Sequence, residues 1–398
     1  MANRIYFANQ QVAFRRDASV GVASWTAAHG VQSVAVTTTF NLEQAFELGQ
    51  LAIYENIEGV PDIEMTMSKV LDGYPLLYHL ATDEVAGHGH GPTLAGRSNA
   101  KCVAALGVWP DTQDSASGNP SQQMEASGMF CSAVSYNFPL EDNFSEDVTI
   151  VGNNKGWKDA GAATAIGCAS PGWAFVYATG EFANNDDVPL ASTANGAASG
   201  QYGGVNRREN LSFASSEAIL SDSTSGVDYT KLPTELPGVD SNGWMSARNA
   251  INAVHLQSIT VSTDLGREEL FELGTRQPYA RVVTFPVEVT CDIEMLSLSG
   301  DMINAFADGC NDSDDQCTGI VDNLTNQTIR IATCEGTRVF IGNKNKLASV
   351  NYGGGDAGGG NVTVTYSYTT FNDFTVLHPR DPNDSGNAWW DNRSTYLQ

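Results

Sequence analysis

The chain has 398 residues, of which 46 are Asp or Glu and 21 are Lys or Arg, and its formal net charge is −25. Tight binding of nucleic acid rests on basic side chains that displace counterions from phosphates, so this composition argues against a conventional nucleic-acid-binding protein. The chain has no run of about 18 apolar residues, and residues 1–7 lack the apolar core of a signal peptide, so we expect neither a membrane-spanning helix nor export by the common route.

The first half of the chain is predicted to be mostly β. Alternation of apolar and polar residues is typical of half-buried strands. It predicts strands at 34–40, 63–67, 130–138 and 148–150, after an extended segment at 4–16. Residues 41–48 predict a single turn of helix that Gly49 limits, and 74–81 predict a short helix with Pro75 near its start.

The second half repeats this kind of pattern after a segment of different composition. Residues 156–205 are rich in Gly, Ala, Ser and Asn, which predicts a connector. Strands are then predicted at 287–293, 348–352 and 362–369, with a short helix at 302–307. The glycine-rich run 353–360 suits a hairpin turn. The two tryptophans at 389–390 predict a tail that docks on a neighbour.

One stretch occurs twice, so that positions 31–61 match positions 256–286 one for one. Over these 31 positions, eleven residues are identical in the two copies, where chance would give roughly two or three. In the first copy they are Gln32, Ser33, Val36, Thr38, Glu43, Phe46, Glu47, Leu48, Gly49, Tyr54 and Pro61. Such self-similarity indicates an internal duplication, and therefore two related domains.

A four-residue segment is the most specific part of the repeat. It reads Phe46, Glu47, Leu48, Gly49 in the first copy and Phe271, Glu272, Leu273, Gly274 in the second. A kept glycine suggests a positive φ or a close backbone approach, and a kept glutamate suggests a defined partner such as a neighbouring subunit. The alternative is a helix end with a solvated glutamate and a glycine stop. We predict that these eight residues serve assembly.

No catalytic, cofactor or metal site is predicted. The chain has no Gly-x-Ser-x-Gly and no His-Glu-x-x-His motif. His88 and His90 lack further ligands nearby, and the acidic run 312–315 lacks the glycine and the terminal glutamate of a calcium loop. The seven cysteines are scattered, which favours free structural thiols and leaves a Cys310–Cys317 disulfide open.

The duplicated pattern resembles the tail tube proteins of tailed bacteriophages. The resemblance rests on the strand at 31–40, the Glu-Leu-Gly segment, the strand after Pro61 and the helix after Gly73. Residues 232–237, 267–274 and 285–289 strengthen it in the second half, and together these segments cover less than half of the chain.

The resemblance implies two tandem β-sandwich or barrel domains with short helices. We expect a first tube domain at 1–155, the connector at 156–205 and a second tube domain with its tail at 206–398. Two such domains per chain would let three chains form a pseudo-sixfold ring. The implied protein is a non-enzymatic virion component, assembled in the host cytoplasm.

The same resemblance implies its partners. Stacked rings would form a tube whose acidic and small polar lining conducts DNA without binding it specifically. The other expected partners are the tape measure, the terminator and, in a contractile tail, the sheath. An alternative is a β-rich surface adhesin or carbohydrate-binding module, which shares the strands and the acidity but does not require the repeat.

Overall fold

The computed structural model describes residues 5–16, 26–49, 51, 53–82, 91–109, 120–159, 205–213, 229–239, 255–297, 300–301, 303, 325–353, 360–379 and 381. Strands account for 56% of these residues and helices for 6%, so the predicted mainly β fold is confirmed. Among the described residues no sheet closes into a barrel. Of the two forms expected for the domains, a closed barrel is therefore not found within one chain.

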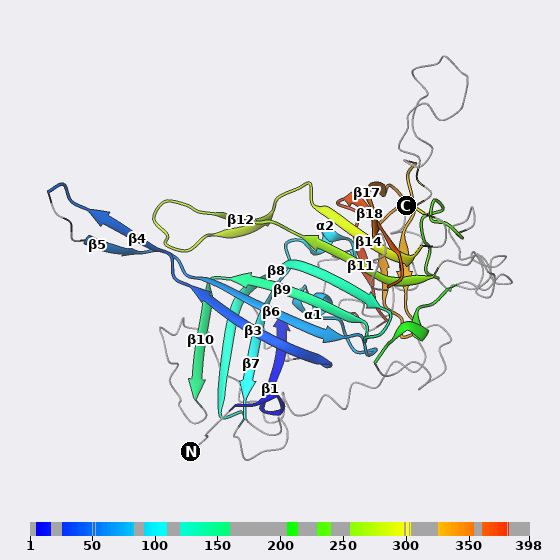
Figure 1. The fold of residues 1–398 in the computed structure, drawn as a ribbon. Helices are drawn as coiled ribbons and strands as arrows, with labels where there is room; N and C mark the ends of the chain where they lie inside the picture. Colours follow the sequence, from blue (N-terminus) through cyan, green and yellow to red (C-terminus); the bar gives the residue numbers. More distant parts are fainter. Residues whose placement is uncertain are drawn as a thin grey trace.

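The largest sheet has twelve strands, and eight antiparallel ones, here called the main sheet, run in the order β3–β6–β9–β8–β11–β14–β18–β17 (Figure 1). In that order they span Val31–Thr39, Asp62–Val70, Ser145–Gly152, Gln122–Pro139, Leu256–Asp264, Glu288–Leu296, Thr363–Phe371 and Lys346–Gly353. β8 comes from the first half of the chain and β11 from the second. Their pairing therefore joins the two halves in one sheet.

Four further strands continue the same sheet. β8 extends beyond the eight strands to pair with β7 and β10, β7 pairs with β1, and β1 with β2. In the second half, β15, β16 and β19 form a three-stranded sheet. These strands are β1 (Gln10–Arg16), β2 (Thr26–Ala27), β7 (Lys101–Val108), β10 (Asn154–Asp159), β15 (Arg330–Ala332), β16 (Arg338–Phe340) and β19 (Thr375–Leu377). The buried helix α1 (Leu77–Ala81) contacts β1, β7, β8 and β9, and α2 (Leu94–Arg97) follows it.

The main sheet is apolar on the covered side because its strands alternate. In β6, Ile63 and Met65 are buried while Glu64 between them is exposed. In β18, Tyr366 and Tyr368 are buried in the same way. These side chains belong to one hydrophobic core that runs through both halves. The sheet is therefore stabilised from one side and leaves its other face available.

Strand bounds and register shifts can be compared between the two halves of the main sheet. We call β3, β6, β9 and β8 unit 1, and β11, β14, β18 and β17 unit 2. When positions 31–61 are aligned with positions 256–286, β11 covers the positions equivalent to β3. In the same alignment, β14 starts and ends one position later than the equivalent of β6. The register of each first pair shifts at corresponding positions, between Val31 and Ser33 and between Leu256 and Ser258.

Most predicted elements are found, with one clear error. The strands predicted at 34–40, 63–67, 130–138 and 362–369 correspond to β3, β6, β8 and β18, and the helix at 74–81 corresponds to α1. The predicted helical turn at 41–48 is wrong, because that segment forms β4 (Leu42–Phe46) and pairs with β5 (Ile53–Glu58). A single turn of helix is marginal without a packed face, whereas hairpin pairing satisfies the backbone locally.

Several predictions fall outside the described residues. These are most of the connector, the helix at 302–307 apart from Ile303, the dipeptide 389–390, the histidines at 88 and 90, and the segment 310–317. The domain boundaries 1–155, 156–205 and 206–398 also stay a prediction. Of the cysteines, Cys131 and Cys291 are buried thiols, as expected.

Candidate assembly surfaces

The uncovered face of the main sheet, here called the polar face, carries small polar and acidic side chains. One row of paired residues crosses six strands and reads Ser68, Asp147, Ser135, Ser262, Thr290, Thr369. Glu64, Asp292 and Glu294 lie on the same face. Among the described residues of these eight strands the basic side chains are Lys69, which is buried in the core, and Lys346, at the start of β17. The polar face therefore repels polyanions.

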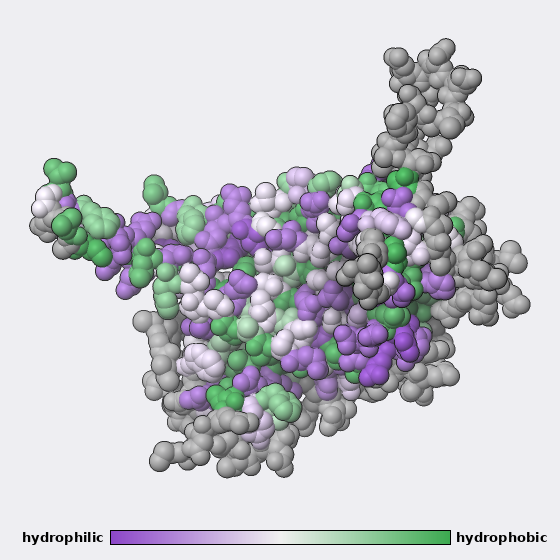
Figure 2. All heavy atoms as spheres, in the orientation of Figure 1, coloured by the Kyte–Doolittle hydropathy of each residue, from purple (hydrophilic) through white to green (hydrophobic). Residues whose placement is uncertain are grey.

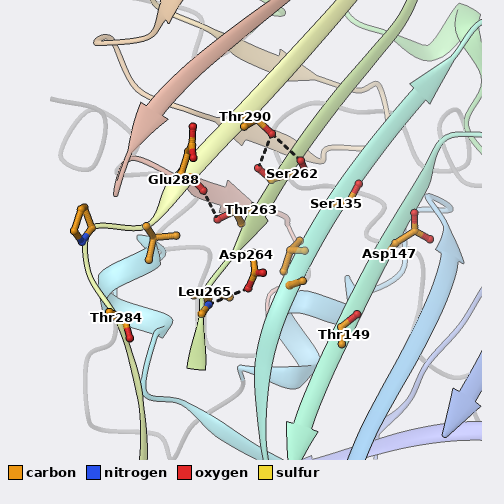
Figure 3. Close-up of a pocket in the computed structure, with 15 residues that line it drawn as sticks. Ser135, Asp147, Thr149, Ser262, Thr263, Asp264, Leu265, Thr284, Glu288 and Thr290 are labelled. Carbon is orange, nitrogen blue, oxygen red and sulfur yellow. Dashed lines mark hydrogen bonds between the residues drawn. The ribbon is translucent and has the colours of Figure 1, made fainter. Parts of the chain in front are cut away.

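Hydrogen bonds fix part of this face (Figure 3). The hydroxyl groups of Ser262 and Thr290 lie 2.8 Å apart. Outside the view of that figure, the Ser258 hydroxyl donates to Glu294 over 3.1 Å. An open hollow of about 620 Å³ lies over β8, β9, β11 and β14, with Asp147 on its wall. Its lining offers hydroxyls and carboxylates rather than an aromatic platform, so it is a segment of the polar face.

At the two ends of these eight strands lie β3 and β17, each paired on one side only among the described residues, as are β2 and β10 elsewhere in the same twelve-stranded sheet. The exposed fraction of Tyr136, in the inner strand β8, can be compared with that of Tyr352, in the end strand β17. Tyr136 is 0% exposed and faces Val261 of β11 across the strand pair. Tyr352, at the sheet edge, is 47% exposed. Such edges are templates for pairing with another strand.

Two hairpins extend from the same end of the sheet (Figure 1). Arm 1 comprises β4 and β5 (residues 42–58), and arm 2 comprises β12 (Arg267–Leu270) and β13 (Ala280–Val283). Their registers correspond, since Leu42 pairs with Glu58 in arm 1 as Arg267 pairs with Val283 in arm 2. Arm 1 carries exposed apolar side chains, which gather at the left of Figure 2.

The predicted assembly residues form the turns of these arms. Leu48 and Leu273 are fully exposed, and Gly49 and Gly274 have φ values of +96° and +95°. The positive φ explains why glycine stands at both positions, because other residues rarely adopt it. The alternative of a helix end is wrong, since each segment lies in a hairpin turn. The segments 46–49 and 271–274 lie at equivalent positions of two separate arms and do not form a single site. Their role in assembly stays a prediction.

Arginines hold arm 2 against unit 1. Arg267 donates from Nε to the Cys131 carbonyl over 2.8 Å, and its guanidinium lies 5.2 Å from the centre of the Phe130 ring. Arg281 donates to Asp62 over 2.8 Å and to Asn153 over 3.1 Å, and it also pairs with Glu269.

At the far end of arm 2, Arg276 reaches the base of arm 1. It donates to the carbonyls of Glu58 and Gly59 over 2.9 and 3.0 Å. Sequence reasoning missed these arginine contacts. The available signal was the presence of three arginines between 267 and 281 in a chain with only 21 Lys and Arg.

Two buried ionisable groups lie behind these surfaces. Burial raises the pKa of Glu146, although hydrogen bonds from Tyr78, Tyr136 and Leu77 oppose the shift. Burial lowers the pKa of His79 to about 4, against the influence of Asp381. Neither group is among the residues that line the hollow of the polar face.

Neither a metal cluster nor a membrane-spanning helix is found in the part of the chain that the structure describes. No group of three or more His, Cys, Asp or Glu side chains there is placed to hold a metal ion. The helices described are also too short or too polar to cross a membrane.

Comparison with known proteins gives only distant similarities. No protein-family model and no curated protein matches the chain. A chain from the sixfold-symmetrised baseplate of the anti-feeding prophage is similar at 9% identity and a TM-score of 0.30, over 40% of this chain and 98% of that one. A chain from the tube-terminating cap of the anti-feeding prophage gives 12% and 0.27, over 40% and 94%.

A third similarity is to a chain of the PVC sheath-tube complex, an extracellular contractile injection system in its extended state. Identity is 11% and the TM-score 0.27, over 40% of this chain and 93% of that one. At these scores the likeness carries no argument about function, which has to rest on this chain's own surfaces.

Proposed function

We propose that this chain is a structural subunit of a phage-type tail tube, in which three copies form a ring around a bore. The observation that carries the proposal is the pairing of β8 with β11. β8 is the last strand of unit 1 and β11 the first strand of unit 2, so the chain already contains one junction between two such units. At the two ends, β17 is the last strand of unit 2 and β3 is the first strand of unit 1.

The internal junction supplies the register of the proposed junction between chains. A register shift between Cys131 and Ala133 in β8 corresponds to one between Leu347 and Ser349 in β17. This correspondence equates Tyr136 with Tyr352. Because Tyr136 faces Val261, and Val261 corresponds to Val36, Tyr352 of one copy is expected to face Val36 of the next. The half-exposed Tyr352 would then be covered as Tyr136 is.

A duplicated unit supports three chains per ring. The strand order, the register shifts and the matching positions of β3 with β11 and of β6 with β14 suit two copies of one ancestral unit. Each chain would fill two of six equivalent positions, and closure would pair the β3 and β17 edges of every chain. The polar face would line the bore, where carboxylates such as Asp147 and Asp292 make few favourable contacts with phosphate.

Engineered disulfides test the ring. We expect the double variant Thr37→Cys/Asn351→Cys to give a covalent three-chain species under mild oxidation, because the proposed register places these residues opposite each other. The matched control is Ser135→Cys/Ser262→Cys, whose positions correspond to them and are paired within the chain. It should form an intramolecular bridge. The readout is a non-reducing gel, with the wild-type chain as baseline for native cysteines.

The register makes the outcome decisive. Thr37→Cys/Val350→Cys places the two thiols on opposite faces of the sheet and should give no bridge. If the control bridges but Thr37→Cys/Asn351→Cys yields only monomer under conditions where rings are seen by electron microscopy, β3 and β17 do not pair as proposed. A monomeric protein without rings that binds glycans would instead favour the adhesin alternative.

Lysines on the polar face test its role in DNA passage. In assembled tails we expect Ser135→Lys/Ser262→Lys/Thr365→Lys to slow DNA ejection severalfold, with the delay shrinking at higher salt, because the new ammonium groups bind phosphates. The matched glutamate triple variant should eject at the normal rate. Unchanged ejection by lysine variants whose tails assemble normally would show that this face does not line the bore.

A further inference from the structure

The two arms differ in how they are equipped for contact. Arm 2 is held by charged groups at Arg267, Glu269, Arg276 and Arg281. At the corresponding positions of the repeat, arm 1 has Leu42, Gln44, Leu51 and Asn56. Arm 1 therefore has the same hairpin but no charge at these four positions, although Glu43, Glu47, Glu55 and Glu58 are exposed on it.

The apolar side chains of arm 1 are exposed. Leu42 is 59% exposed, Phe46 65%, Leu51 103% and Tyr54 67%. Exposed apolar patches of this kind mark interaction sites in soluble proteins.

Unit 2 differs from unit 1 in a complementary way. Arm 2 crosses unit 1 near Asn153 and ends at the base of arm 1, next to Val60. Two phenylalanines occupy the corresponding positions in unit 2. The strand registers match Gly152 in β9 with Thr370 in β18, so Phe371 corresponds to Asn153. The repeat matches Phe285 with Val60. Both phenylalanines are exposed, Phe285 to 46% and Phe371 to 56%. Where unit 1 offers polar groups to a charged arm, unit 2 offers aromatic rings.

The directions of the arms bring these surfaces together in a ring. Arm 2 rises from β11 and β14 and leans over unit 1, toward the β3 edge. Arm 1 rises from β3 and β6 and points away from the body of the chain (Figure 1). The proposed β3–β17 junction would place unit 2 of a second copy there. Continuing the internal pattern, arm 1 would cross that unit as arm 2 crosses unit 1.

We propose that arm 1 docks on unit 2 of the adjacent copy in the same ring, with its apolar side chains on Phe285 and Phe371. The inference rests on the proposed ring, and it adds that the contact inside each chain is polar while the contact between chains is apolar. The apolar arm lets chains associate through burial of area, whereas the arginine contacts of arm 2 order its own chain. Leu51 would lie near Thr284 of the neighbour, as Arg276 lies near Gly59.

A cross-link between these two positions tests the proposal. We expect Leu51→Cys/Thr284→Cys, treated with a short bismaleimide, to give species that stop at three chains. The control Glu58→Cys/Arg276→Cys uses the contact within one chain and should cross-link intramolecularly. Products that grow beyond three chains would place arm 1 on the next ring and overturn the proposal. The proposal would also be overturned if the Leu51→Cys/Thr284→Cys cross-link failed while the Thr37→Cys/Asn351→Cys disulfide closed the ring. If neither bond formed, the proposed ring itself would be wrong.

A second measurement does not depend on cross-linker geometry. Phe371→Ser should raise the protein concentration needed for ring formation by about tenfold, because it removes an aromatic contact from each junction. The control is Phe7→Ser, since Phe7 is 89% exposed and belongs to a different element, residues 7–9. It should leave the concentration dependence unchanged. Equal behaviour of the two variants in analytical ultracentrifugation would contradict the assignment of Phe371 to the interface.

Discussion

Replacing Glu146 with leucine is expected to lower the free energy of unfolding by about 3–5 kcal/mol, the cost of breaking a buried charged group's contacts. Glu146 lies on the core side of β9 and is fully buried. Its carboxylate accepts hydrogen bonds from the backbone N–H of Leu77 over 2.6 Å and of Tyr78 over 3.1 Å, at the start of α1. It also accepts one from the Tyr136 hydroxyl over 2.8 Å. Leucine would leave three buried donors without a partner.

Urea denaturation measures this loss. Glu146→Gln should cost less than Glu146→Leu, because the amide oxygen still accepts some of the three hydrogen bonds. Asp147→Asn is the matched control. Its side chain lies one residue along on the polar face, and the change should stay within about 0.5 kcal/mol. A loss below about 1 kcal/mol for Glu146→Leu would mean that the carboxylate does not hold α1 to the sheet.

Acidification between pH 6.5 and 4 should destabilise the protein through His79. Its pKa falls from 6.5 to about 4 because the imidazole is buried, and Nε2 lies 3.2 Å from the Val376 carbonyl. The unfolded chain takes up a proton below pH 6.5 while the folded chain does not until about pH 4. The contribution of neutral His79 is therefore complete above pH 6.5 and is lost on acidification. At about 1.4 kcal/mol per pH unit, the free energy of unfolding lost between pH 6.5 and 4 amounts to about 3 kcal/mol.

The difference between wild type and His79→Gln isolates this contribution. Glutamine cannot titrate here, and its amide N–H₂ can donate to Val376, so the variant should lose less stability between pH 6.5 and 4. The charged neighbours Asp381 and Arg97 are common to both proteins. Glu146 has a raised pKa and acts in the opposite direction, and it cancels in the difference. His255→Gln, at an exposed position, is the control. Parallel pH profiles for wild type and His79→Gln would disprove this account.

Local pattern predicted the strands because burial on one side of a sheet leaves a period of two in the sequence. The alternation at 63–67 and at 362–369 marks the core side of β6 and β18. The repeated 46–49 and 271–274 segments, each ending in glycine, likewise anticipated a special backbone conformation. These features depend on residues close together in the chain.

Features that depend on distant partners could not be predicted in this way. Glu146 stands on the apolar side of β9, and its hydrogen-bond partners at 77 and 78 lie 69 and 68 positions away. The segment 41–48 is a different case, because its partner β5 lies close in sequence and the prediction of a helical turn missed a local hairpin. Strand pairing and buried polar contacts were therefore decided by the fold.

The sequence by itself determined that the protein is mainly β and acidic, and it showed that positions 31–61 resemble positions 256–286, because composition, alternation and identity at a fixed offset are written along the chain. Only the tertiary structure decided that β8 pairs with β11, which residues face outward on the polar face, and which two strands form the edges. The physical reason is that backbone hydrogen bonding is the same for every sequence, so the choice of partner strand depends on packing between residues far apart.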